Sequence, residues 1–209
     1  MASQTNGYVN LNANQYNTYD AYRNYCLNHG INVDYFAGNQ CWDSLALLWY
    51  QYGLSLVTRP QGNGAAYMCW TISKNTNARP PFIAVEGVEN IKRGDIIVFN
   101  KSPRHSAGHI CLADTDYGDR YYDRGAWKLY CIGQNQGQGT GWGVPSNRVG
   151  QNLVDFLGIF RNTNWTTTPP TPPTPPTPEM GYNKDKYNFV LFNRRKRQAQ
   201  WTKKPLNKR

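Results

Sequence analysis

Apolar residues near the start of the chain recur with a helical period. Within Cys41–Tyr52 the apolar side chains stand three and four positions apart, which is typical of an amphipathic helix. Gly53 is expected to end this helix, and Asn39 is a candidate N-cap. A second helix is predicted over Tyr16–Leu27, and the polar, glycine-containing segment Gly30–Asn39 is predicted to be a loop.

After about residue 83 the pattern changes to short apolar runs separated by Gly, Asp and Asn, which are typical of strands. Helices followed by a series of strands predict an α+β fold, in which N-terminal helices pack on an antiparallel β-sheet. The predicted strands are Asp95–Phe99, His109–Ala113, Lys128–Ile132 and Leu157–Phe160.

A low-complexity segment divides the chain. Residues 166–178 read TTTPPTPPTPPTP, and because proline fixes φ and excludes a helix, this segment is predicted to be an extended polyproline II linker. At about 3.1 Å per residue it spans roughly 40 Å. The predicted parts are a folded domain at 1–165, this Thr/Pro-rich linker, and a short basic C-terminal tail at 179–209 with one candidate strand, Tyr187–Phe192.

Composition indicates a packed core, because aromatic residues make up 14% of the chain and charged residues only 17%. The longest apolar runs, such as Ile96–Phe99, are far shorter than the ~20 residues that cross a bilayer, so no transmembrane helix is predicted. Residues 1–6 lack the basic and apolar regions of a signal peptide, and none is predicted.

The net charge of +10 belongs mainly to the tail. Residues 1–178 contain 13 basic and 11 acidic residues, whereas residues 179–209 contain 10 and 2. The folded domain therefore lacks the charge expected of a nucleic-acid-binding surface. Only the tail, with its basic run Arg194–Arg197, suits a polyanion.

Three residues fit the chemistry of a thiol nucleophile, although a lone cysteine is more often part of a core. The five cysteines have no CxxC pair and no metal-ligand spacing. Cys41 stands at a predicted helix start, where free N–H groups favour a thiolate. His109 opens one predicted strand and Asn135 follows another, so they offer a base and a polar partner for it. His105 is the rival base, and His29 is expected to cap the first helix.

Four segments strengthen this interpretation. They are NVDYFAGNQCWD at 32–43, RGDIIVF at 93–99, GHIC at 108–111 and IGQN at 132–135. In this order and spacing they resemble the motifs of the CHAP family, the cysteine, histidine-dependent amidohydrolases and peptidases of the papain-like superfamily that are common in phage endolysins. The resemblance covers roughly residues 16–162 and implies that 1–165 is a papain-like CHAP catalytic domain.

The resemblance implies a role for each matching residue. Cys41 would attack an amide of peptidoglycan, His109 would act as base and then as acid, and Asn135 would orient the imidazole. Gln40, together with the Cys41 N–H, is a candidate for stabilising the oxyanion. Trp142, in the glycine-rich segment 137–143, is a candidate to stack on a sugar or peptide of the substrate.

Two positions depart from the family pattern. Many members carry Glu where this chain has Gly133, and Trp where it has Gln136. The missing Glu leaves the orienting role to Asn135 alone. It also motivates an alternative function, a catalytically weak virion structural or wall-binding module with a CHAP-like fold.

A subset of the family binds calcium in the loop before the cysteine. The matching positions here are Asn32, Asp34 and Asp43, with the carbonyl oxygen of Phe36 as a further ligand. Ca²⁺ takes six to eight oxygens and accepts an Asn oxygen in place of a carboxylate. The competing interpretation is a metal-free loop in which Asp43 caps its own helix. Calcium is the only cofactor that the resemblance implies.

The leading hypothesis is therefore a peptidoglycan hydrolase, either an endopeptidase or an N-acetylmuramoyl-L-alanine amidase. As a phage endolysin or a tail-associated lysin, it would be made in the host cytoplasm and reach the wall after holin-mediated release or within the virion. The tail would bind teichoic acid or other virion proteins, or simply be a disordered tail that aids solubility. A nucleic-acid-binding protein acting through the tail is a third hypothesis, and no membrane partner is expected.

Overall fold

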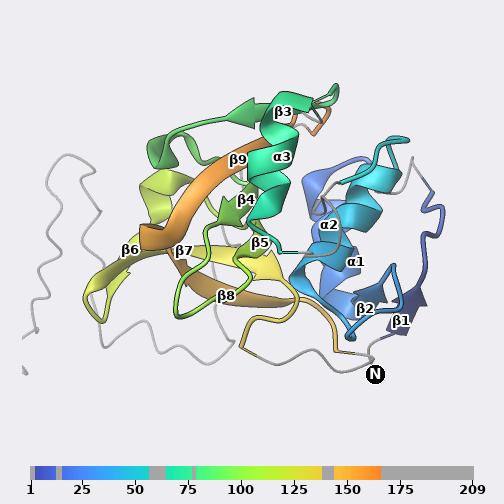
Figure 1. Ribbon diagram of the computed structural model, residues 1–209, viewed down its shortest axis with the longest axis horizontal. Coiled ribbons are helices and arrows are strands. Elements are labelled where there is room, and N and C mark those ends of the chain that lie inside the picture. Colours follow the sequence, from blue (N-terminus) through green and yellow to red (C-terminus); the bar gives the residue numbers. More distant parts are fainter. Residues whose placement is uncertain (1–2, 13–15, 57–64, 77–78, 138–143, 166–209) are drawn as a thin grey trace, which may run out of the picture. The chain divides into compact units, whose positions relative to one another are not determined.

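The computed structural model describes residues 3–12, 16–56, 65–76, 79–137 and 144–165 (Figure 1). Trp142, the predicted linker at 166–178 and the predicted tail at 179–209, with its candidate strand and basic run, lie outside these residues. Within the described ranges, no helix has both the length and the apolar character needed to cross a membrane.

The first helix, α1 (Tyr19–Asn28), begins where a side chain satisfies its free N–H groups. The Thr18 hydroxyl accepts a hydrogen bond from the backbone N–H of Ala21. His29 is the C-cap residue, as predicted, and its ring stacks on that of Tyr25 with centroids 4.1 Å apart. The predicted helix is confirmed, with a start three residues later.

The second helix, α2 (Cys41–Tyr50), is also confirmed, and Gly53 closes it in a left-handed conformation with φ 67°. Its N-cap residue is Gln40, so the prediction of Asn39 was wrong. Asn39 is instead buried, and its side-chain amide donates to the backbone oxygen of Val144 at 2.8 Å. A third helix, α3 (Met68–Thr76), was not predicted.

Seven strands form an antiparallel sheet in the order β3-β9-β4-β5-β7-β6, with β8 paired to β7. The α+β prediction of helices packed on an antiparallel sheet is confirmed, as are all four predicted strands. These are β4 (Ile96–Phe99), β5 (His109–Ala113), β7 (Ala126–Gly133) and β9 (Phe156–Asn162). The additional strands are β3 (Phe82–Val85), β6 (Tyr121–Asp123) and β8 (Asn147–Asn152).

Two short strands form a separate parallel pair, β1 (Ser3–Asn6) and β2 (His29–Asn32). The loop predicted over Gly30–Asn39 was therefore wrong in its first three residues. The side chain of Gln134 binds both the N–H and the oxygen of Ile31, at 2.6 and 2.9 Å. Strand β2 is therefore stabilised by residues that are distant in the sequence, and its own composition does not predict it.

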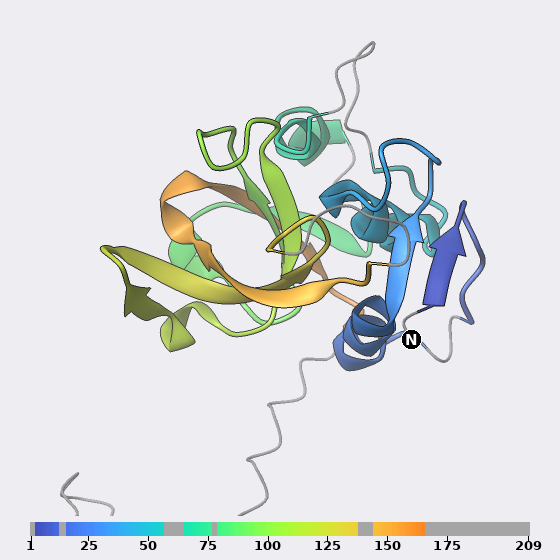
Figure 2. The same cartoon turned by 90° about the horizontal axis from the view of Figure 1, so that it is seen from below.

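The sheet buries side chains on both faces. Along β4, Ile96 and Val98 belong to the core beneath the helices, whereas Ile97 and Phe99 belong to a second apolar cluster. Figure 2 shows the strands curving, and this second cluster packs between β4, β5, β7 and β9. Burial on both faces explains why these strands are continuous apolar runs instead of alternating ones. On the helical side, α2 packs on β5 and α3 on β9 (Figure 1).

One buried carboxylate ties the first helix to the sheet. Asp114, directly after β5, accepts hydrogen bonds from Tyr19 at 2.8 Å, from Arg23 Nε at 2.6 Å and from Arg148 Nε at 2.5 Å. Burial alone would raise the pKa of Asp114, but these three donors together hold it below its ordinary value. Two of the donors lie on α1 and one on β8, so this residue fixes how those elements meet.

Candidate active site

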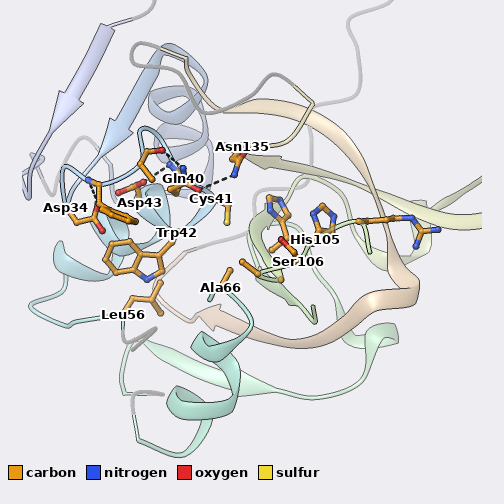
Figure 3. A pocket seen from close by; sticks show the side chains of 16 residues that line it. Asp34, Gln40, Cys41, Trp42, Asp43, Leu56, Ala66, His105, Ser106 and Asn135 are labelled. Atoms are coloured by element: carbon orange, nitrogen blue, oxygen red, sulfur yellow. Dashed lines mark hydrogen bonds between the residues drawn. The ribbon is translucent and has the colours of Figure 1, made fainter. Parts of the chain in front are cut away.

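A cleft of about 890 Å³ lies at the junction of α2 and β5. Its lining includes Cys41, His109, Gln40 and Asn135, the four residues predicted to carry the chemistry. In Figure 3, Asp34 and Asp43 lie on one side of Cys41, and Asn135 and His105 lie on the other. The structure thus brings the ends of elements far apart in the sequence to one opening.

Cys41 occupies the first position of α2, and the helix start is held by its own side chains. The carboxylate of Asp43 accepts hydrogen bonds from the Gln40 N–H at 2.7 Å and from the Val33 N–H at 2.9 Å. These bonds satisfy a free N–H at the helix start and attach the preceding loop to it. The Cys41 side chain, at the first position of this helix, consequently lines the cleft.

The Cys41 thiol is more protonated than the sequence suggested. Burial raises its pKa to about 11, even though N–H groups of Ile110, Cys41 and Trp42 favour the thiolate. The predicted effect of the N–H groups at the helix start is thus present, but desolvation outweighs it. The effect of the Ile110 N–H, from the residue after His109, indicates that the sulfur lies close to the His109 end of β5.

His109 is the first residue of β5 and pairs across the sheet with Phe99. Its side chain is only 2% exposed, and burial lowers its pKa to about 4, against an opposing effect from its hydrogen bond to Gln136. The ring Nε2 lies 2.8 Å from the side-chain oxygen of Gln136. At neutral pH the site therefore holds a neutral imidazole beside a neutral thiol.

Asn135 does not contact His109 among the hydrogen bonds of the described residues. Its side-chain Nδ2 instead donates to the Gln40 side-chain oxygen at 3.2 Å (Figure 3). The backbone of Asn135 is left-handed, with φ 52°, a conformation that asparagine tolerates better than most residues. The contact to the imidazole that was predicted for Asn135 is thus made by Gln136. Asn135 instead bonds the side chain of Gln40, the residue before Cys41.

Gln134, next to Asn135 and Gln136, also connects the end of β7 to the residues around the cleft. It is 1% exposed, and its Nε2 donates to the backbone oxygen of Gln40 at 2.9 Å as well as to that of Ile31. The end of β7 is therefore bonded to the residue that precedes Cys41. Sequence reasoning assigned no role to Gln134 or Gln136, although the density of amides in QNQGQG was a visible signal.

His105, the rival base, also lines the cleft. Its ring stacks on that of His109, with centroids 4.9 Å apart and planes inclined by 16°. Burial lowers its pKa, against opposing effects of the Asp155 charge and of Gln151. The third histidine, His29, lies at the end of α1 and does not line this cleft.

The predicted calcium ligands surround the loop before α2. Asp34 is exposed and accepts from the Phe36 N–H at 2.9 Å, whereas Asp43 is buried. Burial raises the pKa of Asp43 to about 7, and the charge of Asp34 acts in the same direction. The Asn32 side chain is fully buried, and its amide has no hydrogen-bond partner within the described part of the chain. Both Asp43 oxygens already accept backbone N–H groups, so Asp43 caps its own helix, as the competing interpretation predicted. The unpartnered Asn32 oxygen and the exposed Asp34 carboxylate are oxygen donors of the kind that calcium takes.

The solved structure of one known protein agrees with this architecture. The crystal structure of the wild-type endolysin LysIME-EF1 has a TM-score of 0.51 and 19% identity, over 70% of this chain and 64% of that one. The chain has a lysin-like fold. The crystal structure of Ly7917 gives a TM-score of 0.46 and 13% identity, over 73% of this chain and 63% of that one. This chain therefore spans less than two thirds of the length of either protein.

No protein-family model matches the chain, and no curated protein matches it. At 19% identity the likeness to the endolysin is a likeness of fold. Any assignment of activity consequently depends on the geometry of the cleft and on the residues that line it.

Proposed function

We propose that this protein is a peptidoglycan hydrolase of the CHAP type, which cleaves a wall amide with Cys41 as nucleophile and His109 as base. The observation that carries the proposal is that both side chains line one cleft, Cys41 from the first position of α2 and His109 from the first position of β5. The lysin-like fold supports the substrate class. The proposal covers both a free phage endolysin and a tail-associated lysin of the virion.

In the first half of the reaction, His109 takes the thiol proton on the ring nitrogen that does not face Gln136, while the sulfur bonds to the amide carbon. The C–N bond of the tetrahedral intermediate then breaks, and His109 returns the proton to the departing amine. In the second half, His109 takes a proton from water as the water oxygen bonds to the thioester carbon. The C–S bond breaks, a carboxylic acid leaves, and Cys41 regains its proton.

The oxyanion of each intermediate would lie at the start of α2. The Cys41 N–H has no partner one turn earlier in the helix, and such groups stabilise developing negative charge. The Gln40 side-chain nitrogen already donates to Ala37, and its second hydrogen is the other donor of the proposal. Because Asn135 binds the oxygen of this same amide, it positions the Gln40 donor.

The chemistry of the bond provides the first test. Digestion of purified Gram-positive walls is expected to release new amino groups, without new reducing sugar ends, as turbidity falls. Mass analysis then separates the two amide classes, because an amidase exposes the amino end of the stem peptide and an endopeptidase opens a peptide bond. New reducing ends would contradict the proposal. Wall binding without new amino groups would favour the catalytically weak wall-binding module.

Calcium belongs to the same proposal. Asn32, Asp34, Asp43 and the Phe36 carbonyl would hold the ion, which would supply positive charge against two carboxylates beside the cleft. We expect millimolar Ca²⁺ to raise the melting temperature of the wild type, since a ligand at 100 times its Kd stabilises the folded state by about 2.7 kcal/mol. Calorimetry with calcium and with a chelator measures this difference.

The control for calcium is a pair of matched carboxylates. Asp34→Ala should abolish the calcium-dependent rise in melting temperature, whereas Asp119→Ala should preserve it, because both residues are exposed and only Asp34 lies in the loop before α2. An equal rise in both variants would show that the ion binds elsewhere. No rise in the wild type would remove calcium from the proposal and leave the nucleophile and base untouched.

A further inference from the structure

The polar partner of the catalytic imidazole is a residue that the sequence motifs did not assign. The side chains of His109 and Gln136 are 2% and 4% exposed, and the imidazole Nε2 meets the Gln136 oxygen at 2.8 Å. A hydrogen bond this short between two buried groups strongly restricts the rotation of the ring. The hydrogen bond therefore also fixes the direction in which the other ring nitrogen, Nδ1, points.

The amide of Gln136 is itself held in one orientation. Its nitrogen donates to the backbone oxygens of Cys131, at 3.2 Å, and Asn147, at 2.9 Å. The nitrogen must face these two acceptors, so the oxygen must face the imidazole. The Gln151 nitrogen donates to the same oxygen at 2.8 Å, which fixes it from a second side.

This orientation determines the tautomer of His109. Because the Gln136 oxygen can only accept, the ring Nε2 that meets it must carry the hydrogen. The ring Nδ1 is then left with its lone pair, which is the form that can take a proton from a thiol. A glutamine at this place thus selects the same tautomer that a carboxylate would select, without adding a charge.

Gly133 provides the space for this arrangement. A Cβ atom added to Gly133 would lie 3.0 Å from the Gln136 side-chain oxygen and 3.2 Å from its Cδ. Such distances are tighter than about nine in ten Cβ contacts, and the Cβ of Cys111 would also lie 3.0 Å away, so these neighbours would have to shift by a few tenths of an ångström. The Gln136 amide therefore occupies part of the room that a side chain at position 133 would need.

We propose that Gln136 is the positioning residue for His109, and that it takes over the orienting role for which Gly133 has no side chain. The role rests on the proposed function for the reaction it serves, but the tautomer that it enforces is a property of the folded protein. Gln151 and His105 support it from outside, the first through the Gln136 oxygen and the second by stacking on His109.

The test compares the wild type with Gln136→Met, which keeps the length of the side chain and removes its hydrogen bonds. ¹⁵N NMR of the imidazole should show the Nε2–H tautomer in the wild type and a mixture of tautomers in the variant. Iodoacetamide should alkylate Cys41 about 10-fold more slowly in the variant at pH 7, and kcat for wall amides should fall by about 100-fold with little change in KM.

Two further variants guard against a loss of folding. Gly133→Ala keeps Gln136 but displaces its amide, so it should show the same loss of tautomer and of kcat to a smaller degree. Gln51→Met is the matched control, because the Gln51 side chain, like that of Gln136, bonds backbone groups, here those of Val9, Leu11 and Leu47, but it does not line the cleft and has no hydrogen bond to a histidine among the described residues. It should leave the His109 spectrum and the alkylation rate as in the wild type.

The outcomes separate this inference from the proposed function. An unchanged tautomer and alkylation rate in folded Gln136→Met would overturn the positioning role, whether or not the wild type digests walls. A changed tautomer and a slower alkylation, in a protein that digests no wall, would support the positioning role and remove the proposed function. Equal kcat in the wild type and in Gln136→Met would also overturn the positioning role of Gln136.

Discussion

Replacing Cys41 with alanine is expected to lower the rate of wall-amide cleavage by at least about 10³-fold while leaving the fold intact. The reason is that alanine cannot form the thioester, and water would have to attack the amide directly. The first position of α2 accepts alanine readily, since the hydrogen bonds of the helix start come from Asp43. Release of amino groups from walls, with melting curves of both proteins, measures this effect.

Cys69→Ala is the matched control for this loss. Cys69 is a fully buried thiol on α3 that does not line the cleft, so its removal should preserve activity at a small cost in stability. Iodoacetamide should likewise label Cys41 ahead of the four other buried cysteines. Activity of Cys41→Ala within 10-fold of the wild type would contradict the assignment of the nucleophile.

The pKa values of His109 and Cys41 determine how activity depends on pH. Burial lowers the pKa of His109 to about 4 and raises that of Cys41 to about 11. The reactive form has a neutral imidazole and a protonated thiol, so kcat/KM should rise as the pH rises through the pKa of His109 and then stay level across neutrality. An acid limb near pH 7 would show that the imidazole is far easier to protonate than its burial implies.

Asp114→Ala is expected to produce the largest loss of stability, about 3 kcal/mol, because it leaves Tyr19, Arg23 and Arg148 without their shared acceptor. The Arg148 side chain is 39% exposed and can turn to water, which keeps the expected loss at the low end for a buried ion pair. For a domain of this size the melting temperature should fall by roughly 6–12 °C, as calorimetry can measure.

The stabilisation from Asp114 should depend on pH in a defined direction. Its pKa is lower in the folded protein than in the unfolded chain, so its contribution is complete above the unfolded pKa and is lost as the pH falls through the folded pKa. The difference between wild type and Asp114→Ala should therefore shrink on acidification below about pH 4. Asp123→Ala removes an exposed ion pair with Lys128 and should leave the melting temperature nearly unchanged. Equal losses in both variants would contradict this account.

Local pattern predicted those elements whose own residues determine them. The period of α2 and the apolar run of β5 are readable because burial repeats within the element itself. Strand β8 (NRVGQN) is polar and half-exposed, so it owes its form to pairing with β7. The same limit applies at the site. The sequence located Cys41 and His109 through local motifs, but Gln136 bonds to His109 across 27 positions, and only the fold brings them together.

A Cβ at position 133 would crowd the Gln136 amide, so substitutions at these two positions, three residues apart, depend on one another. A substitution that restored a carboxylate at 133 would meet the Gln136 amide, and loss of the amide alone would leave the imidazole without a partner. Each change by itself is therefore expected to be harmful, whereas the two together exchange one arrangement for another. A screen for active enzymes that reads only position 133 would therefore misjudge this chain, because its polar partner for His109 stands at position 136.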